Sequence, residues 1–418
     1  MVARGYKDTE IGVIPIEWDV VELENVLTIQ RGASPRPINK FFTENEDGVS
    51  WIKIGDIQKD AKYIVKTKQK ITQEGAKQSR AIEPKDFVLS NSMSFGRPYI
   101  SKIYGCIHDG WLLLRNKNEN NLSNNFLYEI LSSDLAKNQF KRFAAGSTVN
   151  NLKSETVSTV KIPLPPLKEQ EKIADILSTA DAKIDAIELQ IEKAETLKKG
   201  LLQKLLSEGI GHSKFKESEI GKIPESWEVV ELNDLCSKIV GGGTPNSKID
   251  DYWKNGTIYW ATVKDMDNSK YLSKTQDTIT DLGLKNSSAN LIPANSIITA
   301  TRMGLGRFFI NTVDMAINQD LKALIIKERY DKNFIFWSLV SKSDFILSLG
   351  TGTTVKGIRL EEFKTIKFTI PPLREQKQIA DILSTADEKL EVLRAKKEKY
   401  ETLKKGLLQK LLSGEVRV

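Results

Sequence analysis

The sequence predicts an α+β protein in which two mixed α/β domains are separated by two long antiparallel coiled-coil helices, with a pseudo-two-fold internal repeat. Three observations predict this architecture: an opening segment that occurs twice, a long helical segment that occurs twice, and poorly matched stretches between them. We divide the chain into domain 1 (1–161), helix 1 (162–208), domain 2 (209–367) and helix 2 (368–418).

The repeat is clearest in the opening segment. Glu10–Leu23 (EIGVIPIEWDVVEL) returns as Glu219–Leu232 (EIGKIPESWEVVEL), with ten of fourteen positions identical. By contrast, Gln30–Thr148 and Lys238–Thr354 share only scattered positions. A common frame therefore carries two different inserts, which suits a protein that holds two unlike recognition surfaces.

Each half of the chain ends in a segment that reads as a helix of about 40 residues. Pro165 and Pro166 suit the start of the first helix, and Gly209 suits its end. Apolar residues then recur in heptads along both copies, which leaves a narrow apolar stripe on each helix. The nearest equivalent stripe is the other copy, so we expect the two helices to pair.

The direction of pairing follows from distance. A helix of about 40 residues is about 60 Å long, whereas a compact domain of about 150 residues is about 40 Å across. Domain 2 leaves the end of helix 1 and must reach the start of helix 2, so an antiparallel pair is expected, with one domain at each end. Because the junction Phe215–Gly221 resembles Tyr6–Gly12, the chain termini are expected to meet beside the end of helix 2.

The domains themselves contain short strand-like runs separated by turns. Examples are Trp51–Ile57 and Ile297–Ala300, and a helix is expected near Asn124–Ser133. Trp18 and Trp227 lie inside the best-matched segment, so we interpret them as core residues rather than as platforms for stacked bases. Each domain is therefore predicted to be mixed α/β.

Composition and charge limit the function classes. The chain has 418 residues, 40% hydrophobic and 28% charged, which is ordinary globular composition. It contains no apolar run long enough to span a membrane and no apolar signal-peptide core, so we expect a cytoplasmic protein without a membrane partner. Cys106 and Cys236 have no CxxC partner and are interpreted as buried thiols. The net charge of +7 favours a polyanionic partner.

Known catalytic motifs are missing from the sequence. It has no GxxxxGK[ST] loop, no GxGxxG after a strand, no HExxH, and no Asn-Pro-Pro-Tyr or Asp-Pro-Pro-Tyr. Only two histidines occur: His108, which we interpret as packed or surface-lying, and His212, in a linker. We therefore predict no catalytic residue, no metal site and no cofactor in this chain.

The inserts instead carry loop residues suited to DNA. Arginine and lysine can hydrogen-bond guanine, asparagine and glutamine can bond adenine, and hydroxyl groups can hold phosphates. The candidate DNA-binding residues are Arg31, Arg36, Lys77, Arg80, Asn91 and Arg97 in domain 1, and Thr244, Asn246, Lys285, Asn286, Arg302 and Arg307 in domain 2.

Some of these loops also have a purely structural interpretation. The run Gly241–Gly243 is equally well explained as a flexible turn. The turns Gly146–Thr148 and Gly352–Thr354 recur between the copies and are interpreted as frame elements.

Taken together, these residues resemble the specificity subunits of type I restriction-modification systems. The resemblance spans essentially the whole chain and is carried by the EIGxIPxxW openings, IPLPPLKEQ from Ile162, TIPPLREQ from Thr369, the repeated IADILSTAD and the repeated LKKGLLQKLLS. It implies two target recognition domains, each reading one half of a bipartite, asymmetric double-stranded DNA target, with the helices as a ruler for the spacer.

The resemblance also implies partners. This chain would be the non-catalytic subunit, joined by two methyltransferase subunits and two restriction (motor-nuclease) subunits. The partners would bring S-adenosylmethionine, ATP and Mg²⁺, and would methylate adenine N6 and cleave DNA. The helix segments Ile173–Asp181 and Glu195–Ser207, with their copies, look like the docking surface for the methyltransferase subunits.

Two other function classes stay open at this point. A coiled-coil scaffold with two protein-binding heads would not show the steep salt dependence of DNA binding that phosphate contacts demand. A stand-alone nuclease would show metal-dependent cleavage by the pure chain.

The ruler hypothesis makes a prediction about helix length. Inserting one heptad in each helix is expected to lengthen the preferred spacer while both half-sites stay the same, because the insertion preserves the apolar stripe. The spacer can be measured by mapping the methylated motif, and an altered half-site with an unaltered gap would contradict the hypothesis.

Overall fold

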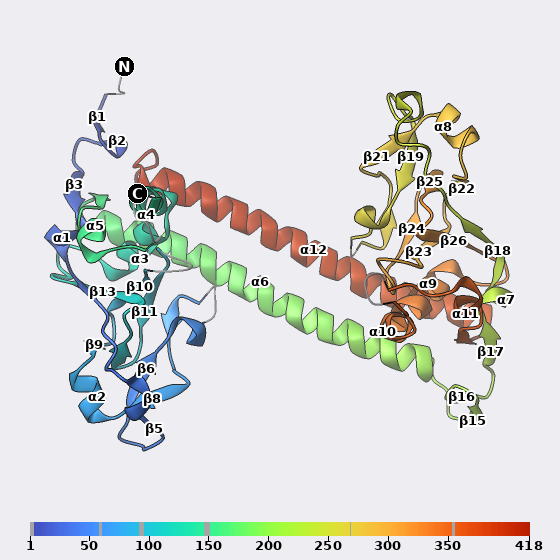
Figure 1. The fold of residues 1–418 in the computed structure, drawn as a ribbon, viewed down its shortest axis with the longest axis horizontal. Helices are drawn as coiled ribbons and strands as arrows, with labels where there is room; N and C mark the ends of the chain where they lie inside the picture. The colour runs from blue at the N-terminus through green and yellow to red at the C-terminus, as the bar shows by residue number, and fades with distance from the viewer. Residues whose placement is uncertain (1–3, 58–60, 92–95, 146–150, 268, 353–355) are drawn as a thin grey trace. The chain divides into compact units, whose positions relative to one another are not determined.

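The computed structural model describes residues 4–57, 61–91, 96–145, 151–267, 269–352 and 356–418 (Figure 1). The chain divides into two compact units. Unit 1 comprises Met1–Glu188 with Lys396–Val418, and unit 2 comprises Leu189–Ala395. Each unit therefore combines one globular domain with part of each long helix.

Unit 1 is built on two mixed sheets. In spatial order, the first contains β4 (Leu27–Arg31), β13 (Trp111–Asn116), β10 (Phe87–Ser90), β11 (Pro98–Ser101) and β7 (Tyr63–Ile64). The second contains β5 (Phe42–Thr43), β8 (Gln69–Ile71), β6 (Val49–Ile52), β12 (Gly105–Ile107) and β9 (Arg80–Ile82). The pairs β11–β7 and β12–β6 are parallel and the other pairs are antiparallel.

Unit 2 repeats this strand order. Its first sheet contains β18 (Cys236–Gly241), β26 (Leu321–Ile326), β23 (Ile297–Ala300), β24 (Phe308–Asn311) and β20 (Tyr271–Leu272). Its second contains β21 (Asp277–Ile279), β19 (Ile258–Ala261), β25 (Met315–Ile317) and β22 (Leu291–Ile292). Among the described residues only the counterpart of β5 is missing, so two poorly matched inserts adopt the same topology.

Smaller elements complete each unit. Those of unit 1 are β1 (Tyr6–Thr9), β2 (Gly12–Pro15), β3 (Asp19–Glu22), α1 (Leu23–Val26), η1 (Ile38–Lys40), η2 (Ile54–Asp56), α2 (Gln73–Lys77), α3 (Asn124–Ser132), α4 (Asp134–Ala145), α5 (Ser154–Ser158) and β14 (Lys161–Leu164). Those of unit 2 are β15 (Phe215–Ser218), β16 (Gly221–Pro224), β17 (Glu228–Glu231), α7 (Leu232–Leu235), η3 (Asp250–Tyr252), η4 (Val263–Asp265), α8 (Asp281–Lys285), α9 (Lys332–Ser341), α10 (Ser343–Ser348), α11 (Leu360–Lys364) and β27 (Lys367–Ile370).

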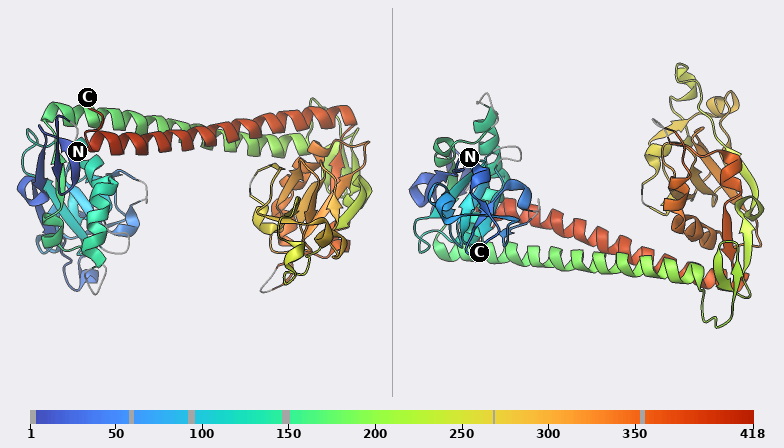
Figure 2. Two further views of the ribbon diagram at one scale, coloured as in Figure 1. Left: turned by 90° about the horizontal axis from the view of Figure 1, so that it is seen from above. Right: turned by 60° about the horizontal axis from the view of Figure 1, so that its bottom comes forward.

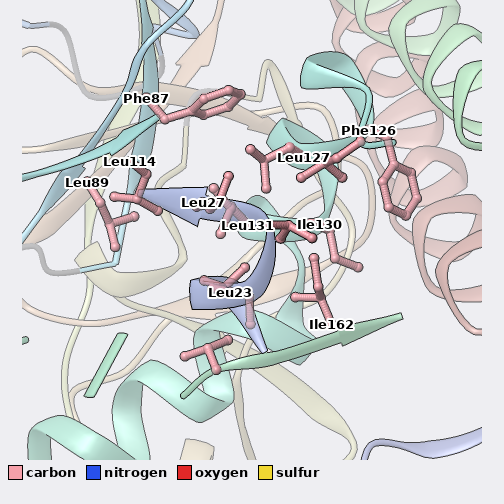
Figure 3. Close-up of a cluster of buried hydrophobic side chains, with 14 of the residues drawn as sticks. Leu23, Leu27, Phe87, Leu89, Leu114, Phe126, Leu127, Ile130, Leu131 and Ile162 are labelled. Carbon is pink, nitrogen blue, oxygen red and sulfur yellow. The ribbon is translucent and has the colours of Figure 1, made fainter. Parts of the chain in front are cut away.

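The core of unit 1 lies between its first sheet and α3. Figure 3 shows Leu127 and Leu131 of α3 among Leu27, Leu89 and Leu114 of the sheet, and all five side chains are buried. Strand β10 is buried along its whole length, which explains why it begins with three consecutive apolar residues rather than an alternating pattern. The packed sheet leaves the loops at its strand ends as the variable part of the domain.

Each opening segment is tied to a long helix by a buried tryptophan. The indole N–H of Trp18 donates a hydrogen bond to Glu169 Oε2 (2.9 Å), and that of Trp227 donates to Glu375 Oε2 (3.1 Å). Both tryptophans are fully buried, which confirms that they are core residues. The two units therefore share the same hydrogen bond between the opening segment and the long helix.

The two long helices pair in an antiparallel manner within each unit. They are α6 (Leu167–Ser207) and α12 (Leu373–Leu412). In unit 1 Lys404, near the end of α12, lies 2.6 Å from Asp181 in the first half of α6. In unit 2 Lys198, near the end of α6, forms the equivalent ion pair with Asp387. Both views in Figure 2 show the start of α6 beside the end of α12 in unit 1.

The heptad stripes form the seam between these helices. The positions predicted for the seam are all buried or half-buried, from Ile173 to Leu205 in α6 and from Ile379 to Leu411 in α12. The predicted coiled coil is therefore confirmed. Its seam lysines are accommodated because Lys198 and Lys404 each reach an aspartate on the opposite helix, and Lys397 reaches Glu188.

The two ends of the chain meet in unit 1, as predicted. The hydroxyl group of Tyr6 donates a hydrogen bond to the carbonyl oxygen of Gly414 (3.0 Å), and Arg417 contacts Glu17 at 2.9 Å. The N-terminal hairpin of β1 and β2 thus lies beside the end of α12.

Other local predictions have mixed outcomes. Ile297–Ala300 is strand β23 and the helix α3 begins at Asn124, as expected. The strand expected over Trp51–Ile57 is wrong beyond Ile52, because Asp56 accepts a hydrogen bond from the backbone N–H of Lys53 and turns the chain into a 3₁₀ helix. The turn Gly146–Thr148 and part of Gly352–Thr354 lie outside the described residues.

Cys106 and Cys236 are buried free thiols, as predicted. Burial raises the pKa of both, and that of Cys236 rises to about 12. Within the described ranges, no helix is both long enough and apolar enough to cross a membrane.

Candidate nucleic-acid interface

A three-residue loop lies at the centre of the candidate site in each unit. In unit 1 this central loop is His108–Gly110, which joins β12 to β13. In unit 2 it is Asn318–Asp320, which joins β25 to β26. The strand order places each central loop beside the segment that leaves β4 or β18, so residues far apart in sequence meet there.

Glycines let the neighbouring segment approach the central loop closely. In unit 1 the backbone N–H of Gly32 donates to the carbonyl oxygen of Trp111 (2.8 Å), and a Cβ atom on Gly32 would lie 2.0 Å from the carbonyl oxygen of His108. In unit 2 a Cβ atom on Gly242 would lie 2.0 Å from the carbonyl oxygen of Ile317. Gly242 is therefore required by close packing, which the flexible-turn interpretation of Gly241–Gly243 does not explain.

In unit 1 three candidate residues converge on Asp109. Its backbone carbonyl oxygen accepts hydrogen bonds from Arg31 Nε (3.2 Å) and Asn91 Nδ2 (2.9 Å). Its carboxylate accepts a hydrogen bond from Ser34 Oγ (2.8 Å) and lies 3.6 Å from Arg36 Nη2. One aspartate thus holds side chains from both neighbouring loops.

The remaining unit 1 candidates lie on the adjoining loops. Arg80 Nε donates to the carbonyl oxygen of Arg31 (3.2 Å). The exposed Lys77 ends α2, and Ser79 in the same turn donates to the carbonyl oxygen of Ala33 (2.6 Å). Arg97 ends the loop between β10 and β11, and residues 92–95 of that loop lie outside the described residues. All six candidates therefore come from segments that border the central loop.

Unit 2 has the same arrangement with different side chains. The hydroxyl group of Thr244 donates to Gln319 Oε1 of the central loop. Arg302 Nε lies 3.7 Å from Asp320 Oδ1, and Arg307 Nη1 donates to the carbonyl oxygen of Met266 (3.4 Å).

The other unit 2 candidates lie at the edge of this cluster. Asn246 Oδ1 accepts a hydrogen bond from the backbone N–H of Lys248 (3.0 Å), so this side chain helps to form its own turn. Lys285 and Asn286 are exposed at the end of α8. Beyond them, Asn290 Nδ2 donates to the carbonyl oxygen of Gly241 (2.9 Å), which joins this loop to the end of β18.

Two arginines occupy equivalent positions in the two units. Arg97 follows Gly96 (φ 78°) and precedes β11, and Arg307 follows Gly306 (φ 78°) and precedes β24. The matching left-handed glycines give the two loops the same final turn. The two units thus present one common arginine position, whereas their other candidate side chains differ.

The protonation states of the unit 1 central loop follow from its contacts. The hydrogen bond from Ser34 lowers the pKa of Asp109, helped by the charge of the nearby Arg31, so the carboxylate is charged at neutral pH. Burial lowers the pKa of His108, so its imidazole is neutral there, and Nδ1 accepts a hydrogen bond from the backbone N–H of Gly110 (2.8 Å). His108 is packed, as predicted, and the loop carries one negative charge among several cations.

The central loops were missed in the sequence because their residues form no motif. The residues concerned are Asp109 in unit 1, and Asn318, Gln319 and Asp320 in unit 2; Ser34, which contacts Asp109, was also missed. The available signal was position: each central loop is a short polar stretch between two buried strands. No cluster of three potential metal ligands occurs among the described residues.

Comparison with known proteins agrees with this two-unit organisation. A family model for the type I restriction modification DNA specificity domain matches residues 15–196 and again 224–402. The putative type I restriction enzyme MjaX specificity subunit of Methanocaldococcus jannaschii is 33% identical, with 99% of this chain and 97% of that protein covered.

Two solved structures share the fold. One is a chain from a study of complex assembly and conformational transition of a type I R-M system, with a TM-score of 0.61, 17% identity, and coverage of 96% of this chain and 99% of that one. The other is the type I restriction-modification S subunit from M. genitalium, with a TM-score of 0.59, 14% identity, and coverage of 95% and 96%.

The close approach at Gly242 predicts a stability effect. Gly242→Ala is expected to destabilise unit 2 by about 1–3 kcal/mol, because the added methyl group meets backbone that cannot move freely. Gly241→Ala is the matched control, since its Cβ atom would lie 3.4 Å from the flexible end of Lys322. Thermal unfolding measures the stability of both variants. A Gly242→Ala variant that melts at the same temperature as the Gly241→Ala control would contradict the packing role of Gly242.

Proposed function

We propose that unit 1 of this chain reads one DNA half-site and that unit 2 reads the other. The chain belongs to the type I restriction-modification DNA specificity family. The chain is a DNA-binding specificity subunit that recognises a bipartite, asymmetric target and docks the partner subunits of the complex. The family model matches once in each half of the chain, as a bipartite reader requires.

One observation carries this proposal. In each unit, candidate side chains from separate loops gather around a central loop on the same sheet topology, yet most of the side chains differ. A shared scaffold with different side chains at its loops recognises different base edges with the same overall docking geometry. Two unlike half-sites follow directly.

The residue types suit both parts of DNA recognition. Arg36, with a side chain 83% exposed, and Arg302, 58% exposed, present guanidinium groups that can bond guanine in the major groove. Exposed residues such as Lys77 and Lys285 suit phosphate contacts, which position a protein without reading sequence. The net charge of +7 favours the same polyanion.

Two methyltransferase subunits and two restriction subunits complete the proposed complex, with S-adenosylmethionine, ATP and Mg²⁺ on those partners. The support is the exact recurrence of helix sequence, since Glu195–Ser207 and Glu401–Ser413 are identical. Within these segments Leu197 and Leu403 are 57% and 53% exposed. Identical apolar residues exposed on both helices suit two copies of one partner.

The proposal is tested by co-expressing this chain with its cognate methyltransferase subunit and mapping N6-methyladenine across the host genome. The expected result is a split motif with a fixed gap that disappears when this chain is omitted. Assembly of the subunits without such a motif would reject the DNA-recognition role.

The equivalent arginines allow each half-site to be assigned to its unit. Arg97→Ala is expected to relax preference in one half-site only, and Arg307→Ala in the other, because the two residues occupy the same position in different units. Methylome mapping of each variant provides the measurement. An equal loss of binding on all DNA sequences would instead identify these arginines as phosphate contacts.

A further inference from the structure

Each cationic loop cluster contains a carboxylate at its centre, which is unexpected in a surface that binds a polyanion. Asp109 contacts Arg31 and Arg36 in unit 1, and Asp320 lies beside Arg302 in unit 2. A negative charge at such a place repels phosphate and therefore weakens general DNA binding.

The carboxylate of Asp109 is held in a fixed orientation. Ser34 Oγ donates to Oδ1 (2.8 Å), and the backbone of Asp109 is fixed by the side chains of Arg31 and Asn91. Oδ2 lies 3.6 Å from Nη2 of Arg36, whose side chain is 83% exposed. The aspartate is therefore fixed by several hydrogen bonds, whereas the side chain of Arg36 is exposed.

Asp320 is held even more firmly in unit 2. Its side chain is 12% exposed, and Oδ2 accepts a hydrogen bond from Asn318 Nδ2 (3.2 Å). Its carbonyl oxygen accepts hydrogen bonds from the backbone N–H (2.8 Å) and the hydroxyl group (3.2 Å) of Thr301. Arg302 approaches Oδ1 through Nε at 3.7 Å, and its side chain is 58% exposed.

The acidic residue occupies different places in the two central loops. Asp109 is the second of its three residues, whereas Asp320 is the third of the three. The partner arginine also comes from a different segment: Arg36 follows β4, while Arg302 lies between β23 and β24. The two units therefore pair a carboxylate of the central loop with an arginine from different loops.

We propose that Asp109 and Asp320 are positioning residues for DNA recognition, each orienting one arginine, Arg36 or Arg302, toward a base edge and away from phosphate. The inference rests on the proposed function. An arginine without such a partner can turn to any nearby phosphate, which gives binding without sequence preference. A fixed carboxylate holds one edge of the guanidinium group and leaves its other donors for a guanine.

The test uses the chain in complex with its methyltransferase subunit. Asp109→Asn keeps the shape of the side chain and an oxygen for Ser34 but removes the charge. It is expected to lower the ratio of specific to nonspecific DNA affinity roughly tenfold. This factor lies at the low end of the discrimination that one base contact provides. Relaxed methylation is expected in one half-site only, and Asp320→Asn should relax the other half-site.

Two further variants separate positioning from other roles. Glu119→Gln removes a carboxylate from the exposed ion pair with Lys85, which includes no candidate DNA-binding residue, and is expected to leave the methylated motif unchanged. On an Arg36→Ala background, Asp109→Asn is expected to have no additional effect, because Asp109 acts through that arginine. A persistent effect on that background would mean that Asp109 contacts DNA directly and would overturn the proposal.

Other outcomes also decide the question. Unchanged methylation by both aspartate variants, or equal loss in both half-sites with a lower melting temperature, would overturn the positioning role. The wild-type complex in the same experiment distinguishes failure of the proposed function from failure of the positioning role. A wild-type complex without a split motif rejects the proposed function itself, whereas a normal wild-type motif with unchanged variants rejects only the role of Asp109 and Asp320.

Discussion

The hydrogen bond from a buried tryptophan to a glutamate in the first turn of a long helix is the contact on which each unit depends. Glu169 and Glu375 are both largely buried, and a buried carboxylate is costly unless it is paired. In unit 1 Arg417 supplies a second partner for Glu169, and that contact raises the pKa of the arginine. In unit 2 His212 and the backbone N–H of Ile210 contact Glu375 instead. The two copies therefore solve one electrostatic problem with different residues, and each solution fastens the start of a helix to its domain.

This frame separates what is constant from what varies. The seam between α6 and α12 is held by apolar heptads and by one repeated lysine–aspartate pair in each unit. The sheets have the same strand order, and Gly32 and Gly242 let the chain pass the central loop at the same place. Variation is concentrated where strands end, because substitutions in loops do not disturb the packed core. A specificity subunit can change its target in this way without losing the surfaces that serve its partners.

Recognition by the candidate interface involves negative as well as positive charge. Arginine provides affinity for DNA of any sequence, so selectivity needs a restraint on where each guanidinium group can point. The carboxylates of the central loops lie where they can impose that restraint. The two units also differ in which loop supplies the paired arginine, Arg36 or Arg302, so a common fold presents different hydrogen-bonding patterns.

The sequence by itself determined the repeat, the two long helices with their antiparallel pairing, the buried tryptophans and the mixed α/β class, because each depends on local periodicity or on a direct match between segments. The short 3₁₀ turn after Ile52 was not predictable, since its cause is a capping contact by Asp56. Only the tertiary structure decided that Arg31, Arg36 and Asn91 meet at Asp109. The segment of Arg31 and Arg36 is distant in the chain from Asn91 and from Asp109, and the strand order β4-β13-β10 brings the three segments together.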